Sequence, residues 1–240
     1  MYILLDANVT AGYYLPHTLD YIKAASRVET LFDSVRSKGS DHFLYLPNFC
    51  VAEVFSVFAK HSYGKWNQQV KKKGGQIDSR VYESICKQFE KDIHNGKLIY
   101  HLELSRYHVL AIDLVAPVDH YFKMNRKKKW VNPAGTFDQL IVSMGIHLAH
   151  IHGPDNVCII STDNRLVNLV KKCRANIPKE TVKMLKLDKA KDIAGNKFSK
   201  RIFPRAIHLG RCGESELRDV LGEWPLEVKR HKKAKRYFRS

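Results

Sequence analysis

The chain has 240 residues, of which 44% are hydrophobic and 10% aromatic, enough for a folded domain with a substantial core. No apolar run reaches the roughly 18 residues of a membrane span, and the start lacks the features of a secretory signal, so we expect no membrane association. The formal net charge of +17 favours a polyanionic partner, most often nucleic acid; the alternatives are solubility or affinity for a protein or anionic membrane surface.

The hydrophobic pattern predicts alternating strands and helices from the first residues onward. Short apolar runs bounded by polar residues indicate buried strands, and apolar positions with helical spacing indicate amphipathic helices. In chain order, the first half is predicted to contain a strand at 3–5, a helix at 19–35, a strand at 42–47, a helix capped by Asn48, a helix at 79–94 and a strand at 98–104.

The alternation continues to about residue 175. The segment "TFDQLIVSMGIHLAHIHG" is predicted to be a helix, with Thr136 and Gln139 at the spacing of a capping box. The next segments, "NVCIIS" and "DNRLVNLVKKCR", have the patterns of a buried strand and a helix. Strands separated by helices indicate βαβ units, and we therefore expect an α/β fold with a mostly parallel sheet covered on both faces.

Two basic segments and the C-terminal third depart from this pattern. Residues 71–76 and 123–135 contain Gly or Pro among their cations and are predicted to be loops. Residues 171–240 hold 21 Lys and Arg against 8 Asp and Glu, a net charge of +13, and "LRDVLGEWPLEV" is compatible with a short helix. We expect a folded domain at 1–172 and a basic C-terminal extension at 173–240, with a mobile tail at 229–240.

Four acids lie where such a sheet would bring them together. Asp6 and Asp163 follow predicted strands, Glu53 lies one turn into the helix after the second strand, and Asp138 begins the helix before "NVCIIS". Parallel sheets bind ligands at the carboxyl ends of their strands. Carboxylates held close together repel each other unless a divalent cation lies between them, and oxygen ligands suit Mg²⁺ or Mn²⁺.

Each acid also has a purely structural interpretation. Asp6 can stabilise a turn, Asp163 can cap the following helix, and Asp138 can interact with a helix dipole. Glu53 is harder to explain in this way, because Ala52 and Val54 flank it and its side of the helix is not clearly charged. The ordered set of four, with matching strand ends, favours a shared site over four separate structural roles.

The segments "LLDAN", "LPNFCVAEVFSVFAK", "GTFDQLIVSMGIHLAH" and "VCIISTDNRL" resemble, in that order, the motif blocks of the PIN-domain nucleases. The resemblance covers about residues 1–172 and implies a three-layer α/β/α sandwich with a central parallel sheet. It implies that acids bind Mg²⁺ or Mn²⁺ and hydrolyse phosphodiester bonds, most often in RNA. The matching positions are four acids and two flanking polar residues, namely Asp6, Glu53, Asp138 and Asp163 with Asn8 and Ser161.

The resemblance therefore implies a metal-dependent endoribonuclease that leaves 5′-phosphate and 3′-hydroxyl ends, with DNA as a second candidate substrate. An inhibitor or antitoxin and a homodimer are partners known in such families. No histidine is needed for the chemistry, so we expect His147 and His150 to be packing or surface residues.

Two other functions are compatible with parts of the sequence. A phosphatase with Asp6 as a covalent nucleophile would need a second acid two residues later, where Asn8 stands instead. A catalytically inactive PIN-like module for RNA binding or scaffolding remains the main alternative, although the presence of all four acids argues against it. Dependence of activity on Mg²⁺ or Mn²⁺ separates the two.

Basic residues interleaved with aromatic ones are candidate nucleic-acid contacts. Cations can follow the phosphates of a strand while aromatic rings stack on unpaired bases. A solvated tail with incidental aromatics is the alternative for Tyr237 and Phe238. The predicted contacts are Lys127, Lys128, Lys129, Trp130, Lys232, Lys233 and Arg236.

The cysteines indicate a reducing compartment. There are five of them, an odd number, and none forms a CxxC pair. Reduced thiols of a cytoplasmic protein fit this pattern better than a disulfide framework or a zinc site. We therefore expect a cytoplasmic location.

Overall fold

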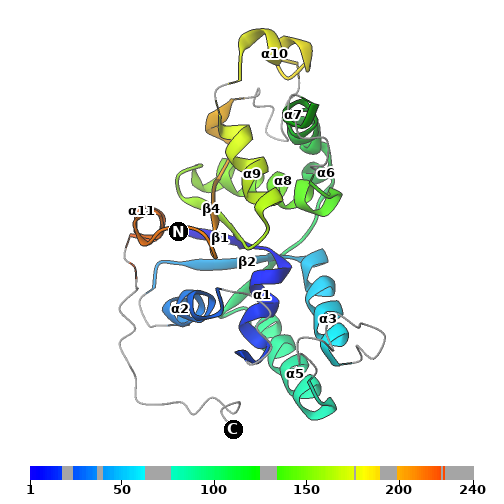
Figure 1. The fold of residues 1–240 in the computed structure, drawn as a ribbon, viewed down its shortest axis with the longest axis vertical. Helices are drawn as coiled ribbons and strands as arrows, with labels where there is room; N and C mark the ends of the chain where they lie inside the picture. Colours follow the sequence, from blue (N-terminus) through cyan, green and yellow to red (C-terminus); the bar gives the residue numbers. More distant parts are fainter. Residues whose placement is uncertain are drawn as a thin grey trace.

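In the computed structural model the described residues are 1–17, 24–36, 40–62, 77–124, 134–175, 177–189, 199–222 and 224. They form alternating strands and helices, as Figure 1 shows. The elements are β1 (Tyr2–Leu5), α1 (Ala7–Tyr14), α2 (Ala25–Arg36), β2 (Phe43–Pro47), α3 (Asn48–Ser62), α5 (Ser79–Asn95), β3 (Ile99–Leu102), α6 (Arg106–Leu110), α7 (Ile112–Met124), α8 (Thr136–His152), β4 (Val157–Ser161), α9 (Asn164–Arg174), α10 (Lys179–Met184), the 3-10 helix η3 (Lys200–Ile202), β5 (Arg205–His208) and α11 (Glu214–Leu221).

The strands form one parallel sheet in the order β3-β2-β1-β4-β5. The chain adds β2 and β3 on one side of β1 and then β4 and β5 on the other side, so the order in which strands are added changes direction at β1. Leu5 pairs with Ile160, so the residues that follow β1 and the end of β4 emerge side by side. The predicted α/β fold with a central parallel sheet is confirmed, and the carboxyl edge next to β1 is where such sheets place their ligands.

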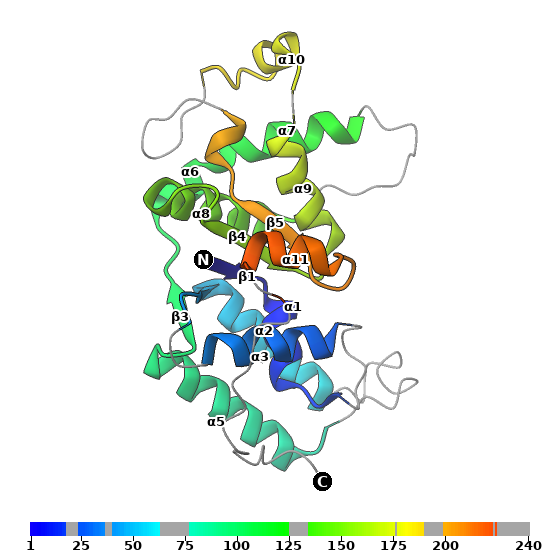
Figure 2. The ribbon, with the colours of Figure 1, turned by 90° about the vertical axis from the view of Figure 1, so that its left-hand side faces the viewer.

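Helices cover the sheet on both faces (Figures 1 and 2). Helices α1, α2, α3 and α5 lie on one face, and α8 and α9 lie on the other, with α6 and α7 packed outside them. In agreement with this arrangement, every residue of β4 is buried, and Ile3, Leu4 and Leu5 of β1 are completely buried. The central strands are therefore apolar without alternation, as expected for a sheet covered on both sides.

The sheet is less completely covered at its β3 side. Leu44, Leu46 and Ile99 are fully buried on one face, whereas Phe43 and Tyr100 are 36% and 37% exposed on the other. Tyr2 stacks on Phe43 with ring centroids 5.3 Å apart, so the aromatic rings partly shield one another. Alternation of buried and exposed residues explains why these two strands contain more aromatic and polar residues than β1 and β4.

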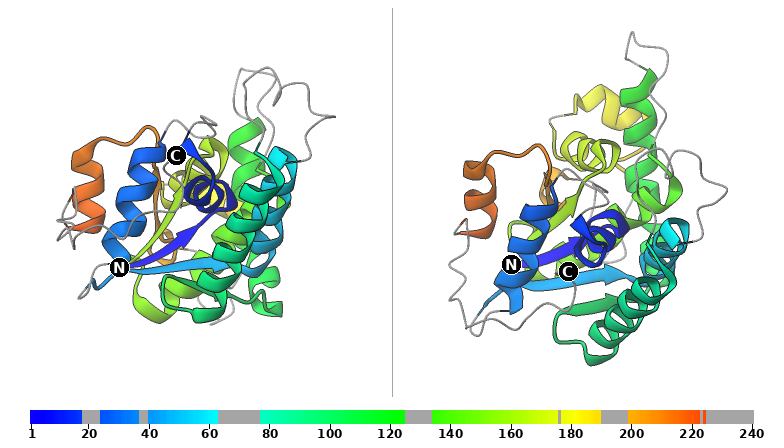
Figure 3. Two further views of the ribbon diagram at one scale, coloured as in Figure 1. Left: turned by 90° about the horizontal axis from the view of Figure 1, so that it is seen from below. Right: turned by 60° about the horizontal axis from the view of Figure 1, so that its bottom comes forward.

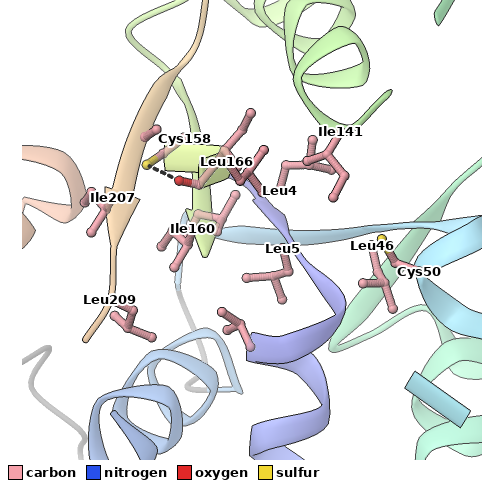
Figure 4. Packing of buried hydrophobic residues seen from close by; sticks show 14 of the residues in the cluster. Leu4, Leu5, Leu46, Cys50, Ile141, Cys158, Ile160, Leu166, Ile207 and Leu209 are labelled. Atoms are coloured by element: carbon pink, nitrogen blue, oxygen red, sulfur yellow. Dashed lines mark hydrogen bonds between the residues drawn. The ribbon is translucent and has the colours of Figure 1, made fainter. Parts of the chain in front are cut away.

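The core joins strands and helices from the whole length of the chain. Figure 4 shows Leu4 and Leu5 of β1 packed among side chains of β2, β4, β5 and the helices α3, α8 and α9. Helix α8 approaches β4 closely at Gly145, where an added Cβ would come within 2.9 Å of Ile159 and Pro204. A larger residue at this position would push α8 away from the sheet.

The predicted strands and the helices at 79–94, 136–153 and 163–174 are confirmed, apart from small differences in their ends. The predicted capping box of Thr136 and Gln139 is wrong, because the N-cap is Gly135, whose backbone N–H donates to the carboxylate of Asp138 at 3.0 Å. Helix α1 was not predicted; it begins directly after Asp6, which caps it.

The C-terminal region contributes to the same sheet. Strand β5 pairs with β4, and the predicted boundary between 172 and 173 falls within α9. Arg27 of α2 donates to the carbonyl oxygens of Leu209 and Cys212 at 3.0 and 2.7 Å, and α11 lies beside α2 (Figure 3). Residues 199–222 are therefore held to the central sheet by both backbone and side-chain contacts.

Candidate active site

Asp6 lies at the exit of β1 and is only 4% exposed. Its Oδ1 accepts a hydrogen bond from the backbone N–H of Val9 at 2.8 Å, which makes Asp6 the N-cap of α1. Its Oδ2 accepts from the hydroxyl of Ser161. Because both oxygens are engaged, the carboxylate is fixed at the carboxyl edge of the sheet, with its charge withdrawn from water.

Ser161 connects Asp6 to Asp163. It is the last residue of β4 and is completely buried. Its hydroxyl donates to Asp6 and accepts from the backbone N–H of Asp163 at 2.8 Å. The polar position predicted to flank the fourth acid therefore orders two of the four acids at once. Asn8, the other predicted flanking residue, is partly buried in the first turn of α1.

Glu53 and Asp138 approach the same edge from two helices. Glu53 is exposed in the second turn of α3, and Asp138 lies partly buried in the first turn of α8. Burial, followed by the negative charge of Asp138, raises the pKa of Glu53. Burial also raises the pKa of Asp138. The hydrogen bond from the backbone N–H of Gly135 lowers this pKa, and the negative charge of Asp163 raises it further.

The four predicted acids form a closed ring of repelling pairs. Asp6 is coupled to Glu53 and Asp163, Glu53 to Asp138, and Asp138 to Asp163. Burial raises the pKa of Asp6 to about 6; the hydrogen bonds from Ser161 and Val9 oppose this shift, and the charges of Glu53 and Asp163 reinforce it. Charge interactions therefore link the four acids pair by pair, but burial is the largest cause of the raised pKa values of Asp6, Glu53 and Asp138.

Asp163 differs from the other three acids because it has a cationic partner. Burial alone would raise its pKa, but hydrogen bonds and charge from Arg165 lower the pKa overall. Arg165 donates from its terminal nitrogen to Oδ2 at 2.8 Å and from Nε to the same oxygen at 3.2 Å. Asp163 also caps α9, as the sequence predicts, by accepting from the backbone N–H of Arg165 at 2.7 Å.

The donor chemistry of the ring suits a hard cation. In the arrangement described, no group of three or more His, Cys, Asp or Glu side chains within the described ranges is close enough to hold a metal ion directly. Burial is the largest cause of the raised pKa values of Asp6, Glu53 and Asp138; repulsion between Asp6 and Glu53 and between Glu53 and Asp138 adds to them, and a divalent cation would relieve it. Magnesium commonly keeps several waters between itself and protein carboxylates, so coupled acids of this kind fit it.

Cys50 lies one turn before Glu53 on α3 and is completely buried. Burial and the charges of Glu53, Asp6 and Asp138 raise the pKa of its thiol far above the ordinary range. The thiol therefore stays protonated and is unsuited to act as a nucleophile. Its small, neutral side chain belongs to the hydrophobic core.

Asp119 supports the site from α7 and was not singled out in the sequence. It is 3% exposed, accepts from the backbone N–H of Ala134 at 2.9 Å, and pairs with Lys172 of α9 at 3.3 Å. Ala134 lies two residues before α8, so Asp119 fixes the approach to the helix that carries Asp138. Asp119 and Lys172 are far apart in sequence, and neither belongs to a motif that would identify the pair.

Arg165 and His208 were also missed. Arg165 stands two residues after Asp163, a spacing that could have indicated a partner for the carboxylate. His208 ends β5, and its protonated form favours the ionised form of Asp163, although burial lowers the pKa of His208. Because β5 was not predicted, no sequence pattern placed His208 at this edge.

The remaining predicted residues lie elsewhere. His147 packs on α8 as expected, with its Nδ1 2.7 Å from Nε2 of His108 on α6. The predicted nucleic-acid contacts fall outside the described residues; they are Lys127, Lys128, Lys129, Trp130, Lys232, Lys233 and Arg236.

Comparison with known proteins adds no family to this description. No protein-family model matches the chain, and no curated protein matches it. Among the described residues, no helix combines the length and the apolar character needed to cross a bilayer. A functional assignment must therefore be based on the chemistry of the site.

Proposed function

We propose that the protein is a metal-dependent endoribonuclease that resembles the PIN-domain nucleases. The observation that carries the proposal is the ring of four acids at the carboxyl edge of a parallel sheet, in which each acid is coupled to two others. Holding Asp6, Glu53 and Asp138 close together, with raised pKa values and no ion pair of their own in the described part of the chain, is unfavourable without a cation, and a function that requires a divalent cation would explain the arrangement.

Asp6, Glu53 and Asp138 are the residues that would hold Mg²⁺ or Mn²⁺, because among the ion pairs of the described residues none involves these three acids, although the charge of Arg165 also acts on Asp138. Asp163 would become a further metal ligand if Arg165 left it to pair with another anion. A bound ion would supply a water of lowered pKa and would neutralise charge on the leaving oxygen of a phosphodiester. The same residues would serve Mg²⁺ and Mn²⁺, which favour similar oxygen ligands.

The protein's own residues have distinct roles in this proposal. Ser161 and the N–H of Val9 keep Asp6 in one orientation. Glu53, an exposed acid with a raised pKa, can accept a proton from water on a carboxylate oxygen. Arg165 has a guanidinium suited to two parallel hydrogen bonds with phosphate, and its side chain is 53% exposed.

The charge of the whole chain supports a nucleic-acid substrate. A net charge of +17 raises the local concentration of a polyanion and compensates for the local negative potential of the four acids. RNA is the proposed substrate and DNA is the second candidate. All five cysteines are free thiols, which supports action in a reducing compartment such as the cytoplasm.

The test is incubation of the purified protein with mixed cellular RNA, with Mn²⁺, with Mg²⁺ or with a chelator, followed by sequencing of new 5′ ends. We expect new ends only with a divalent cation, and their loss in Asp6→Asn and Asp138→Asn. Glu83→Gln, which changes an exposed acid on α5, is the matched control and should cleave like the wild type. Full activity in Asp6→Asn would refute the assignment.

An inactive RNA-binding module is the second candidate, and one feature favours it. Arg165 already neutralises Asp163, and among the described residues no three ligand side chains converge directly on one point. If RNA binds equally well in chelator and in Mn²⁺, and no new ends form with either metal, the binding module is the correct description.

A further inference from the structure

Two phenylalanine rings stack on each other where α3 and α8 begin. Phe49 lies in the first turn of α3 and Phe137 in the first turn of α8. Their ring centroids are 5.4 Å apart, and the ring planes differ by 20°. Phe49 is partly buried against the core, whereas Phe137 is 60% exposed. The pair therefore forms a supported aromatic surface with its outer ring in solvent.

This aromatic pair lies at the margin of the acidic ring. Phe137 immediately precedes Asp138, and Phe49 precedes Glu53 by four residues, which places both on the same side of α3. The stack thus bridges the two helices that carry the two acids. Glu53 and Asp138 are coupled by charge, so the rings and the carboxylates belong to one local surface.

The exposure of Phe137 has no explanation in the packing of the fold. Its ring is more exposed than those of Phe43, Tyr100 and Tyr107, which range from 36% to 38%. A polar residue at this first-turn position would serve the helix equally well and would avoid an apolar surface in water. An apolar ring here is useful if a flat, uncharged group of a ligand covers it.

We infer that the Phe49–Phe137 pair is a stacking platform for one unpaired nucleobase of the strand bound at the acidic ring, an inference that rests on the proposed function. The chain's charge of +17 favours a polyanionic strand, but the acids locally repel its phosphates. Stacking on a neutral ring adds affinity at this place without a cation that would pair with Asp138 or Glu53. Stacking tolerates any base, because every base has a π-face.

The experiment measures binding of single-stranded oligonucleotides to the full-length protein, in Mg²⁺ and in chelator. One series contains a single 2-aminopurine that is moved along the strand, and a second contains a single abasic site moved in the same way. The variants are Phe137→Leu, which removes the flat ring, and Phe137→Tyr, which keeps it. Phe43→Leu is the matched control, because Phe43 is an exposed ring at the opposite end of β2.

We expect the wild type and Phe137→Tyr to quench 2-aminopurine at one position. Phe137→Leu should lose that quenching and bind about 10-fold more weakly. The weakening should disappear when the abasic site occupies that position, because there is then no base to stack. Phe43→Leu should bind like the wild type. Equal quenching and affinity for the wild type and Phe137→Leu, or equal weakening on intact and abasic strands, would overturn the inference.

Cleavage is assayed separately on the same variants, so the two proposals can fail independently. Position-specific quenching without cleavage in any metal would support the platform and refute the nuclease. Cleavage that is the same in the wild type and Phe137→Leu, with unchanged binding, would support the nuclease and overturn the platform. A change in the sedimentation of Phe137→Leu alone, with unchanged oligonucleotide binding, would assign the ring to a protein contact and would also overturn the inference.

Discussion

Asp6 and Asp119 are almost equally buried carboxylates with very different surroundings. Asp6 is 4% exposed and Asp119 is 3% exposed. Asp119 pairs with Lys172, whereas the partners of Asp6 are a hydroxyl and a backbone N–H, and the charges near it are those of other acids. Asp119 has its counter-charge within the fold, whereas Asp6 has none, and we propose that a divalent cation from outside supplies it.

The largest expected effect on stability concerns Asp119, the buried acid that pairs with Lys172. Lys172→Met leaves Asp119 buried without its cation, and we expect a loss of about 3–5 kcal/mol in the free energy of unfolding. Lys171→Met is the matched control, because Lys171 makes an exposed pair with Glu216 that contributes about 0–1 kcal/mol. Urea denaturation measures both. Equal losses in the two variants would show that Asp119 does not depend on its partner.

The second prediction concerns the pH dependence caused by Asp6. Its pKa is about 6 in the fold and 3.8 as an ordinary side chain, so ionisation disfavours the folded state. As pH rises from 3.8 to about 6, the free energy of unfolding of the wild type should fall by about 3 kcal/mol relative to that of Asp6→Asn. Above about pH 6 the difference between the two proteins should stay constant.

Chemical denaturation of both proteins from pH 4 to pH 7.5 tests this pH dependence. The comparison between wild type and Asp6→Asn removes the contributions of acids that do not interact with Asp6, which leaves Asp6 and its coupling to Glu53 and Asp163. A difference that does not change with pH, or that grows in favour of the wild type, would contradict the environment described for Asp6.

The third prediction concerns the hydroxyl of Ser161, which donates a hydrogen bond to Asp6. Ser161→Ala removes the partner of Asp6 Oδ2 and of the Asp163 N–H, and both are left in the interior. We expect a loss of about 1–3 kcal/mol in the free energy of unfolding at pH 7. Ser56→Ala on α3 is the control, since Ser56 is exposed and should change stability little. A neutral result for Ser161→Ala would mean that water replaces the hydroxyl.

The smallest change in stability is expected at Arg165. Because its pair with Asp163 is half exposed, Arg165→Gln should alter the free energy of unfolding by no more than about 1 kcal/mol. The variant should nevertheless bind RNA more weakly and should raise the pKa of Asp163. Titration of the carboxyl by NMR and an RNA binding assay give the two readouts. Unchanged RNA affinity would exclude a phosphate contact by this residue.

The sequence was sufficient to predict a central parallel sheet and four of its five strands. Strands β1 and β4 are continuous apolar runs, and helical spacing identifies α5, α8 and α9. Because parallel strands end at one edge, acids at strand exits were expected to meet there. The coupling among Asp6, Glu53, Asp138 and Asp163 agrees with that expectation, although the metal and the reaction stay predictions.

The missed features depend on contacts between distant residues. Strand β5 is only four residues long, and its buried Ala206 and Ile207 lie between Arg205 and His208, so it has no clear strand pattern. The Asp119–Lys172 pair joins residues 53 positions apart. Helix α1 contains Thr10, Gly12 and two tyrosines, a weak helix-forming sequence, and it is stabilised by burial and by the Asp6 cap.

The most direct test of the central claim is the effect of Mn²⁺ on the stability of the wild type and of Asp6→Asn at pH 7. A cation that binds only the folded state at the acidic ring should stabilise the wild type by about 2.7 kcal/mol at 100 times its dissociation constant. Asp6→Asn should gain much less, because it lacks the buried carboxylate of the ring. Equal stabilisation of both proteins, or none in the wild type, would contradict a cation site at Asp6.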